Sequence, residues 1–212
     1  MKTLKLFQKG VVEKIKKVLE KGEVIVFPSD TVYGLLCDAK NKKAVERIFR
    51  IKKRPKAKPL AVFVKDIEML EAFAEINEKQ KRFLEKILPG KVTVVLKAKS
   101  KVDLAQGIVS SEGTIGFRIP DCPLVNNLLS QFNSPLAQTS ANISGSSPLL
   151  KIGEVLKEFE GAKTKPNLVL DGGDLRKAQP STVIDLTDIQ PKILRKGKIR
   201  KQEIMKIIKS IK

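Results

Sequence analysis

Short apolar runs alternate with amphipathic stretches along this chain. Four apolar residues stand in a row at residues 24–27, a pattern typical of a strand buried on both faces; residues 60–64 form a similar run, and residues 92–96 are also predicted as a strand. Residues 10–21 instead place apolar side chains at helical spacing with lysines opposite, which predicts an amphipathic helix. Strands that alternate with helices in this way predict an α/β fold.

The same patterns predict further elements. We expect helices at residues 41–54, 66–73, 77–88, 124–132, 151–159 and 201–212, strands at 114–120, 135–140 and 167–170, and a long loop at 99–113. Some strand pairs have only turns between them, so both parallel and antiparallel pairing is expected. The chain is therefore predicted to be a single domain over residues 1–212, with a twisted, open, mixed β-sheet flanked by helices.

Composition narrows the possible chemistry. The chain has no histidine, which excludes Ser-His-Asp and Cys-His machinery and zinc sites that use histidine. Cys37 and Cys122 lie far apart without a CxxC pairing, so we expect reduced thiols in the core or near the site. Catalysis must then depend on lysine, arginine, hydroxyls, amides and carboxylates, or on positioning alone.

The large positive charge of the chain has two possible explanations. The net charge is +19, from 42 lysines and arginines against 23 acidic residues. This excess favours polyanionic partners such as nucleotides or RNA, but a lysine-rich solvated surface would give the same sum. No apolar run approaches the length of a membrane span, and no signal peptide is evident, so a cytoplasmic protein without membrane contact is expected.

Polar side chains gather after the strand at residues 24–27. Ser29, Asp30, Thr31 and Tyr33 follow it within six residues. A buried strand that ends in hydroxyls and a carboxylate is how open α/β sheets build ligand sites, although a simple polar turn is the plainer interpretation. This stretch is the first candidate for a site.

A basic loop and a buried arginine add positive charge. Residues 52–58 hold five cations, and Pro55 and Pro59 restrict the loop between a helix end and a strand, which favours phosphate binding over a solvated charge run. In the strand at 114–120, alternation places Thr114, Gly116 and Arg118 on one face. A charge on a central strand requires an anion to meet it.

These features occur together in the order of a known family. The chain carries FPSDTVYGL, Lys52-x-Arg54-x-x-x-Lys58, PGKVT, RIPDCP, Ser140-Ala-Asn142, STV and LRKG. With these motifs in register from about residue 11 to 198, the sequence resembles the threonylcarbamoyl-AMP synthase (YrdC-like) family, in the short form without the extra C-terminal domain.

The resemblance implies a reaction and roles for the residues. Family members join L-threonine, bicarbonate and ATP into threonylcarbamoyl-AMP and pyrophosphate, for the threonylcarbamoyladenosine modification of tRNA, and downstream proteins transfer the group. The implied threonine contacts are Thr31, Arg118, Gln138 and Ser181. The implied ATP contacts are Arg54, Lys58, Thr114, Ser140 and Arg195. The implied catalytic set is Lys52, Arg54, Lys58, Ser140 and Asn142.

Physical chemistry agrees with these implied roles. An arginine fork matches a carboxylate, and clustered cations neutralise a triphosphate. We expect Mg²⁺ to accompany ATP, held mainly by the phosphates and not by a metal site of the protein. The alternatives are a non-catalytic module that binds double-stranded RNA or tRNA through the same basic concavity, and an enzyme of the same fold with another carbamoyl or sugar-phosphate substrate.

Overall fold

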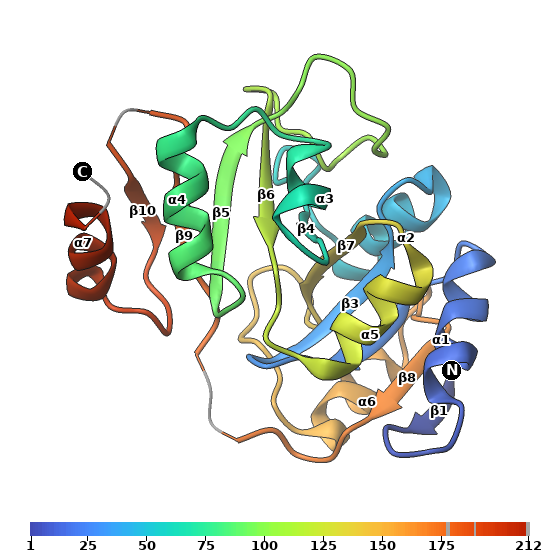
Figure 1. Ribbon diagram of the computed structural model, residues 1–212. Coiled ribbons are helices and arrows are strands. Elements are labelled where there is room, and N and C mark those ends of the chain that lie inside the picture. Colours follow the sequence, from blue (N-terminus) through green and yellow to red (C-terminus); the bar gives the residue numbers. More distant parts are fainter. Residues whose placement is uncertain (177–178, 189, 211–212) are drawn as a thin grey trace.

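A ten-stranded mixed sheet organises the chain in the computed structural model (Figure 1), which describes residues 1–176, 179–188 and 190–210. The strands are β1 (Lys2–Lys5), β2 (Ile25–Pro28), β3 (Tyr33–Asp38), β4 (Ala61–Phe63), β5 (Val92–Lys97), β6 (Thr114–Arg118), β7 (Leu136–Ser140), β8 (Leu168–Asp171), β9 (Thr182–Asp185) and β10 (Lys192–Arg195). Their order across the sheet is β1-β8-β2-β3-β7-β4-β6-β5-β9-β10. The predicted α/β fold with a mixed sheet is confirmed.

The described helices largely match the predicted ones. They are α1 (Val11–Glu20), α2 (Lys42–Lys52), α3 (Ile67–Glu71), α4 (Glu78–Ile87), α5 (Pro123–Phe132), α6 (Ile152–Glu160) and α7 (Lys201–Lys209). Asn41, Asp66 and Asn77 cap α2, α3 and α4, because each side chain accepts a hydrogen bond from a backbone N–H in the first turn. The last two residues of the predicted C-terminal helix lie outside the described residues.

Four of the described strands, β1, β3, β9 and β10, were not among the predicted ones. β1 is mostly exposed at the edge of the sheet, where its lysines face water and it pairs with β8 alone. β3 begins directly after the polar turn at 29–32 and pairs antiparallel with β2 and β7. Residues 99–113 contain neither helix nor strand, as predicted.

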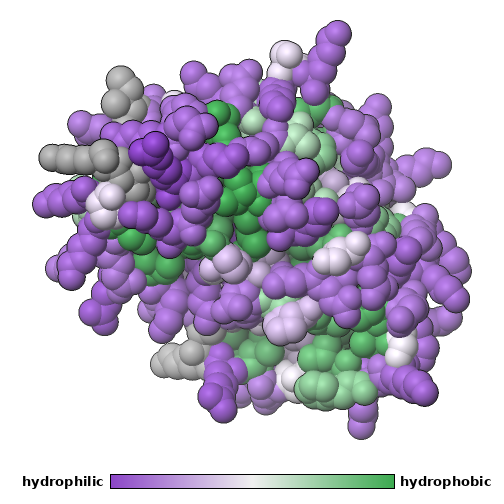
Figure 2. Space-filling model, viewed as in Figure 1, coloured by the Kyte–Doolittle hydropathy of each residue, from purple (hydrophilic) through white to green (hydrophobic). Residues whose placement is uncertain are grey.

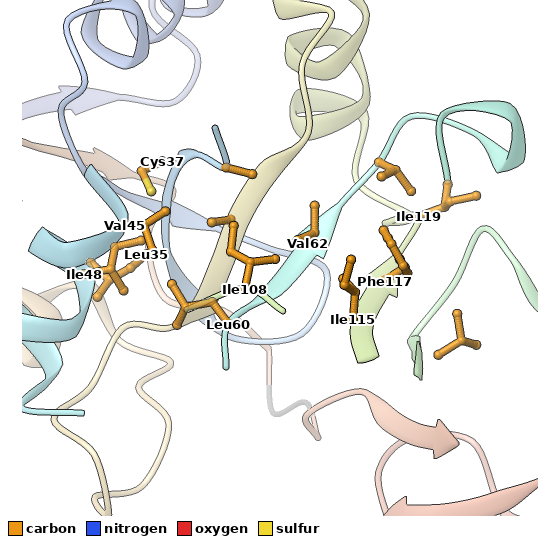
Figure 3. Close-up of a cluster of buried hydrophobic side chains, with 14 of the residues drawn as sticks. Leu35, Cys37, Val45, Ile48, Leu60, Val62, Ile108, Ile115, Phe117 and Ile119 are labelled. Carbon is orange, nitrogen blue, oxygen red and sulfur yellow. The ribbon is translucent and has the colours of Figure 1, made fainter. Parts of the chain in front are cut away.

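The core forms where strand alternation meets helices. Ile25, Phe27 and Leu36 pack with the apolar faces of α1 and α5. Leu35, Val62 and Phe117 belong to a second, larger cluster with side chains of α2, α3 and α4 (Figure 3). Burial of one such side chain stabilises the fold by about 1.5–3 kcal/mol. The packing of these layers therefore determines which strand faces are left uncovered by helices.

Hydrophilic side chains cover most of the face in Figure 2, and hydrophobic ones show in patches between them. No helix in the described ranges is both long and apolar enough to cross a membrane.

Candidate active site

The strands and loops around β6 enclose a cavity of about 420 Å³, which we call the central cavity. Residues from β4, β5, β6, β7, β9 and β10 line it, together with the turn before β3 and the loop after α2. Such a volume is within the range of small-molecule sites.

Strand alternation explains how β6 serves both the core and the cavity. Ile115 and Phe117 are fully buried in the apolar core, whereas Thr114, Gly116 and Arg118 line the central cavity. The predicted face of β6 is therefore confirmed. Gly116 leaves the floor flat between its two neighbours on that face.

Arg118 meets its anion within the protein. Its Nη2 donates to Asp30 Oδ2 at 2.5 Å, and its Nε donates to the Gly90 carbonyl at 3.0 Å. Its Nη1 lies 3.4 Å from Thr31 Oγ1 in the cavity wall. The anion required by the buried charge is thus a carboxylate of the chain, while the Nη1 side of the fork faces the hydroxyl of Thr31.

Burial and pairing act against each other in this ion pair. Burial raises the pKa of Asp30 and lowers the pKa of Arg118, and in each case the charge of the other partner opposes the shift. We assign both groups their charged forms, since the two charges are in direct contact. The Phe63 ring, 5.7 Å from the guanidinium carbon, covers Arg118 from another side.

The turn that carries Asp30 and Thr31 is held by Ser29. Ser29 Oγ donates to the Val32 carbonyl at 2.6 Å and accepts from the N–H groups of Thr31 and Val32, each at 3.1 Å. The hydroxyls of Ser29 and Thr31 are 2.9 Å apart. The segment is therefore both a polar turn and part of the wall of the central cavity.

A second hydroxyl cluster lies on the side of β9. Ser181 Oγ and Thr93 Oγ1 are 2.9 Å apart, and both side chains are buried. Arg195 Nη2 donates to the Ser181 carbonyl at 2.9 Å and to Ser181 Oγ at 3.1 Å. A register shift between Ile193 and Arg195 in β10 lets both Leu194 and Arg195 reach the cavity.

The basic loop contributes one cation to the lining. Arg54 Nε donates to the Lys58 carbonyl at 2.8 Å, and its Nη2 donates to the Pro59 carbonyl at 3.0 Å. These bonds fold the guanidinium over its own loop and towards the cavity, whereas the Lys58 side chain is exposed and outside the lining. Burial, followed by the charge of Arg195, lowers the pKa of Arg54.

Lys52 points into the protein and does not line the cavity. Its side chain is 1% exposed, and its Nζ donates to the carbonyls of Ser140 and Asn142, both at 2.6 Å. Burial, followed by the charge of Arg54, lowers its pKa to about 8. Asn142 Nδ2 donates to the carbonyls of Ile143 and Ser146, so Lys52 and Asn142 together shape the loop after β7.

The structure thus brings together eight of the eleven residues predicted for the site. Thr31, Arg54, Thr114, Arg118, Gln138, Ser140, Ser181 and Arg195 line the central cavity. Lys52 and Asn142 lie behind its wall, and Lys58 lies on the exposed surface of the basic loop.

Two polar residues of the site had no predicted contact or role, although Asp30 lies in the polar stretch that was the first candidate for a site. Thr93 lines the cavity and contacts Ser181, and Asp30 holds Arg118. Both stand inside the motifs SDT and PGKVT, so the motifs were the available signal. Their partners are 88 residues away in each case, and only the folded sheet shows these pairings.

The described residues do not form a metal-binding site. They contain no group of three His, Cys, Asp or Glu side chains that could hold a metal ion. Neither aspartate nor glutamate is among the residues that line the central cavity in the described ranges. Among the described residues, the lining therefore offers arginines to an anion but no carboxylate to a bare metal ion.

Comparison with known proteins identifies the family to which this chain belongs. The family model Sua5/YciO/YrdC, described as telomere recombination, matches residues 17–197. A protein of Methanocaldococcus jannaschii is 36% identical over 93% of this chain and 90% of its own length. A threonylcarbamoyl-AMP synthase of Pyrococcus abyssi is 36% identical over 92% of this chain, but this match spans only 56% of the relative.

Solved structures agree with this result. The P. abyssi Sua5 complex with L-threonine superposes with a TM-score of 0.87 at 32% identity, covering 98% of this chain and 60% of that one. The structure of Escherichia coli YciO gives a TM-score of 0.79 at 30% identity, covering 92% of this chain and 93% of that one. Relatives both longer than this chain and of similar length therefore share the fold.

Proposed function

This chain belongs to the Sua5/YciO/YrdC family, and from that premise we propose that it is an L-threonylcarbamoyladenylate synthase. The observation that carries the proposal is the central cavity, in which Arg54, Arg118 and Arg195 meet hydroxyls from four other segments of the chain. Three fixed cations suit a nucleotide triphosphate and an amino-acid carboxylate, and the hydroxyls suit the polar groups between them. The P. abyssi relatives named above, one a threonylcarbamoyl-AMP synthase and one crystallised with L-threonine, support this choice.

We assign the threonine end of the cavity to Arg118, Thr31, Gln138 and Ser181. Arg118 keeps its Nη1 donor on the side of Thr31, where it can bind the carboxylate of the amino acid. Since Asp30 and Gly90 already hold the other two nitrogens, the fork is preorganised and loses little freedom when a ligand binds.

We assign the nucleotide end to Arg54, Thr114, Ser140 and Arg195. Arg54 and Arg195 are far apart in the sequence, yet their charges are close enough that Arg195 lowers the pKa of Arg54. Two arginines that repel one another in this way are stabilised by a polyanion between them. We also assign Lys58, exposed on the same loop as Arg54, to the nucleotide, and Mg²⁺ is proposed to enter with ATP on the phosphates.

The proposed chemistry requires alignment and charge stabilisation but no covalent enzyme intermediate. The threonine amine attacks the carbon of carbon dioxide derived from bicarbonate and loses a proton, which gives a carbamate. A carbamate oxygen attacks the α-phosphorus. The bond between the α-phosphorus and the oxygen that bridges it to the β-phosphate breaks, which releases pyrophosphate. Fixed cations can stabilise the charge that develops on the leaving group, so a chain without histidine can catalyse the reaction. The product would pass to a separate protein that modifies tRNA.

Pyrophosphate release tests the proposal. The purified chain is incubated with ATP, Mg²⁺ and bicarbonate, and with threonine, serine or no amino acid. We expect release that depends on both threonine and bicarbonate. Release that ignores threonine would refute the assignment and favour another reaction on the same fold.

A variant sharpens the test. Arg118→Lys keeps the charge but removes the fork, so the KM for threonine should rise about 10- to 150-fold while the KM for ATP changes little. Arg82→Lys, on an exposed part of α4, is the matched control and should leave both constants unchanged.

A further inference from the structure

A second, strongly basic pocket of about 670 Å³ adjoins the central cavity. We call it the basic pocket. It is lined by Ser29, Asp30, Thr31, Lys91, Leu175, Arg176, Gln179, Gly197, Lys198 and Arg200. Thr31 lines both spaces, so they adjoin at this residue.

The charges of the basic pocket are nearly all of one sign. Lys91, Arg176, Lys198 and Arg200 face it, and among the described residues no side-chain hydrogen bond or ion pair occupies any of the four. Among its described lining residues, Asp30 is the single carboxylate, and Arg118 neutralises that charge through the contact at 2.5 Å. A cleft lined by unpaired cations concentrates anions.

A close crossing of two chain segments places the cations there. The Lys198 N–H donates to the Pro180 carbonyl at 3.1 Å. Gly197 lies so close to this segment that a Cβ atom would be 2.4 Å from the Pro180 oxygen. The segment therefore presents Arg195 to the central cavity and, three residues later, Lys198 to the basic pocket.

The start of α7 adds to the positive potential. Arg200 is the N-cap of this nine-residue helix, and its side chain makes no capping hydrogen bond. The first N–H groups of a helix carry a partial positive charge, which favours an anion at this end.

We propose that the basic pocket binds a pyrophosphate-type anion. The shared chemistry is a diphosphate with several negative charges, and it has two sources: the β,γ-phosphates of bound ATP, or free pyrophosphate after release. The proposal depends on the proposed function only for naming pyrophosphate as the natural anion. No part of the pocket is among the residues assigned above to ATP.

Calorimetric titration of the full chain with pyrophosphate tests this without threonine or bicarbonate. The test variant is Lys198→Gln with Arg200→Gln. The control is Lys196→Gln with Lys201→Gln, which removes the same charge from neighbouring exposed positions outside the basic pocket. We expect the Kd for pyrophosphate to rise about 3- to 30-fold in the test variant relative to the control.

Titrations with ATP and with AMP distinguish between the two sources of the diphosphate. If the test variant weakens both pyrophosphate and ATP but not AMP, the pocket holds the β,γ-phosphates while they are attached. If it weakens pyrophosphate alone, the pocket holds the released product, and either result supports the site. Equal affinities for pyrophosphate in the two variants, or an equal loss for AMP, overturn the proposal, even where the synthase assay succeeds.

Discussion

The Asp30 carboxylate and the Arg118 guanidinium form a buried ion pair, with 7% and 3% of the two side chains exposed. The pair joins the turn after β2 to the end of β6, on the wall between the central cavity and the basic pocket. Breaking such a pair leaves the other charge buried and uncompensated, which is more costly than the loss of an exposed pair.

Asp30→Asn should therefore lower the free energy of unfolding by about 3–5 kcal/mol. Urea denaturation of the wild type and the variant measures the difference. Asp103→Asn is the control, because Asp103 pairs with Lys40 while its side chain is 81% exposed, and it should cost no more than about 1 kcal/mol. Similar losses in the two variants would contradict the importance of burial for this pair.

Arg54→Ala should weaken ATP binding more than Lys58→Ala. Arg54 lines the central cavity and is held by two carbonyls of its loop, whereas Lys58 is exposed and free to move. We expect about a 10- to 150-fold rise in Kd for Arg54→Ala, and about fivefold or less for Lys58→Ala.

Titration calorimetry with ATP measures both variants, and Lys56→Ala, exposed on the same loop, is the control for charge alone. A larger loss in Lys58→Ala than in Arg54→Ala would mean that the loop reorganises around the nucleotide.

Gly197→Ala should disturb the crossing that presents Arg195 to the central cavity and Lys198 to the basic pocket. A Cβ atom at this position would lie 2.4 Å from the Pro180 oxygen and 2.5 Å from the Ser181 carbonyl carbon. The segments must move apart, at a cost of about 1–3 kcal/mol, and Arg195 would lose its contacts with Ser181.

Thermal unfolding and ATP affinity together test this, and both should fall. Gly153→Ala is the opposite control, because a Cβ atom at Gly153 in α6 would meet no other part of the protein within 4 Å, and alanine there should stabilise the helix by about 0.5–1 kcal/mol. Unchanged ATP affinity in Gly197→Ala would separate the crossing from the site.

The periodicity of apolar residues was enough to predict most of the fold and one wall of the central cavity. The two-residue period of β6 was enough to place Arg118 on the same face as Thr114, because one face of that strand is fully apolar. β1 escaped prediction because an exposed edge strand needs no apolar pattern.

The Lys-x-Arg motif identified two residues of the site region, but their closeness in the sequence did not show that they lie in different environments. Lys52 and Arg54 stand two residues apart, yet α2 ends between them and Lys53 adopts a left-handed conformation with φ 49°. The last turn of the helix buries Lys52 against the loop after β7, while the turned chain sends Arg54 to the cavity. A spacing of Lys-x-Arg cannot distinguish these two environments without the helix end.

Lys52 should make stability depend on pH in the alkaline range. Burial lowers its pKa to about 8 from an ordinary value of 10.5, so the folded protein releases this proton earlier than the unfolded chain does. Between these values the unfolded state binds more protons, and stability rises with pH through this group. Relative to Lys52→Met, the wild type should therefore gain on the order of 3 kcal/mol between pH 8 and pH 10.5.

Urea denaturation at several pH values in this window measures the difference between the two proteins, which cancels the titration of other groups. Below pH 8 Lys52→Met still lacks the donor for the carbonyls of Ser140 and Asn142, so it should be less stable than the wild type throughout. Lys43→Met, exposed on the same helix, should follow the wild type in parallel at every pH. A constant difference between the wild type and Lys52→Met from pH 8 to pH 10.5 would show that Lys52 keeps its charge in the fold.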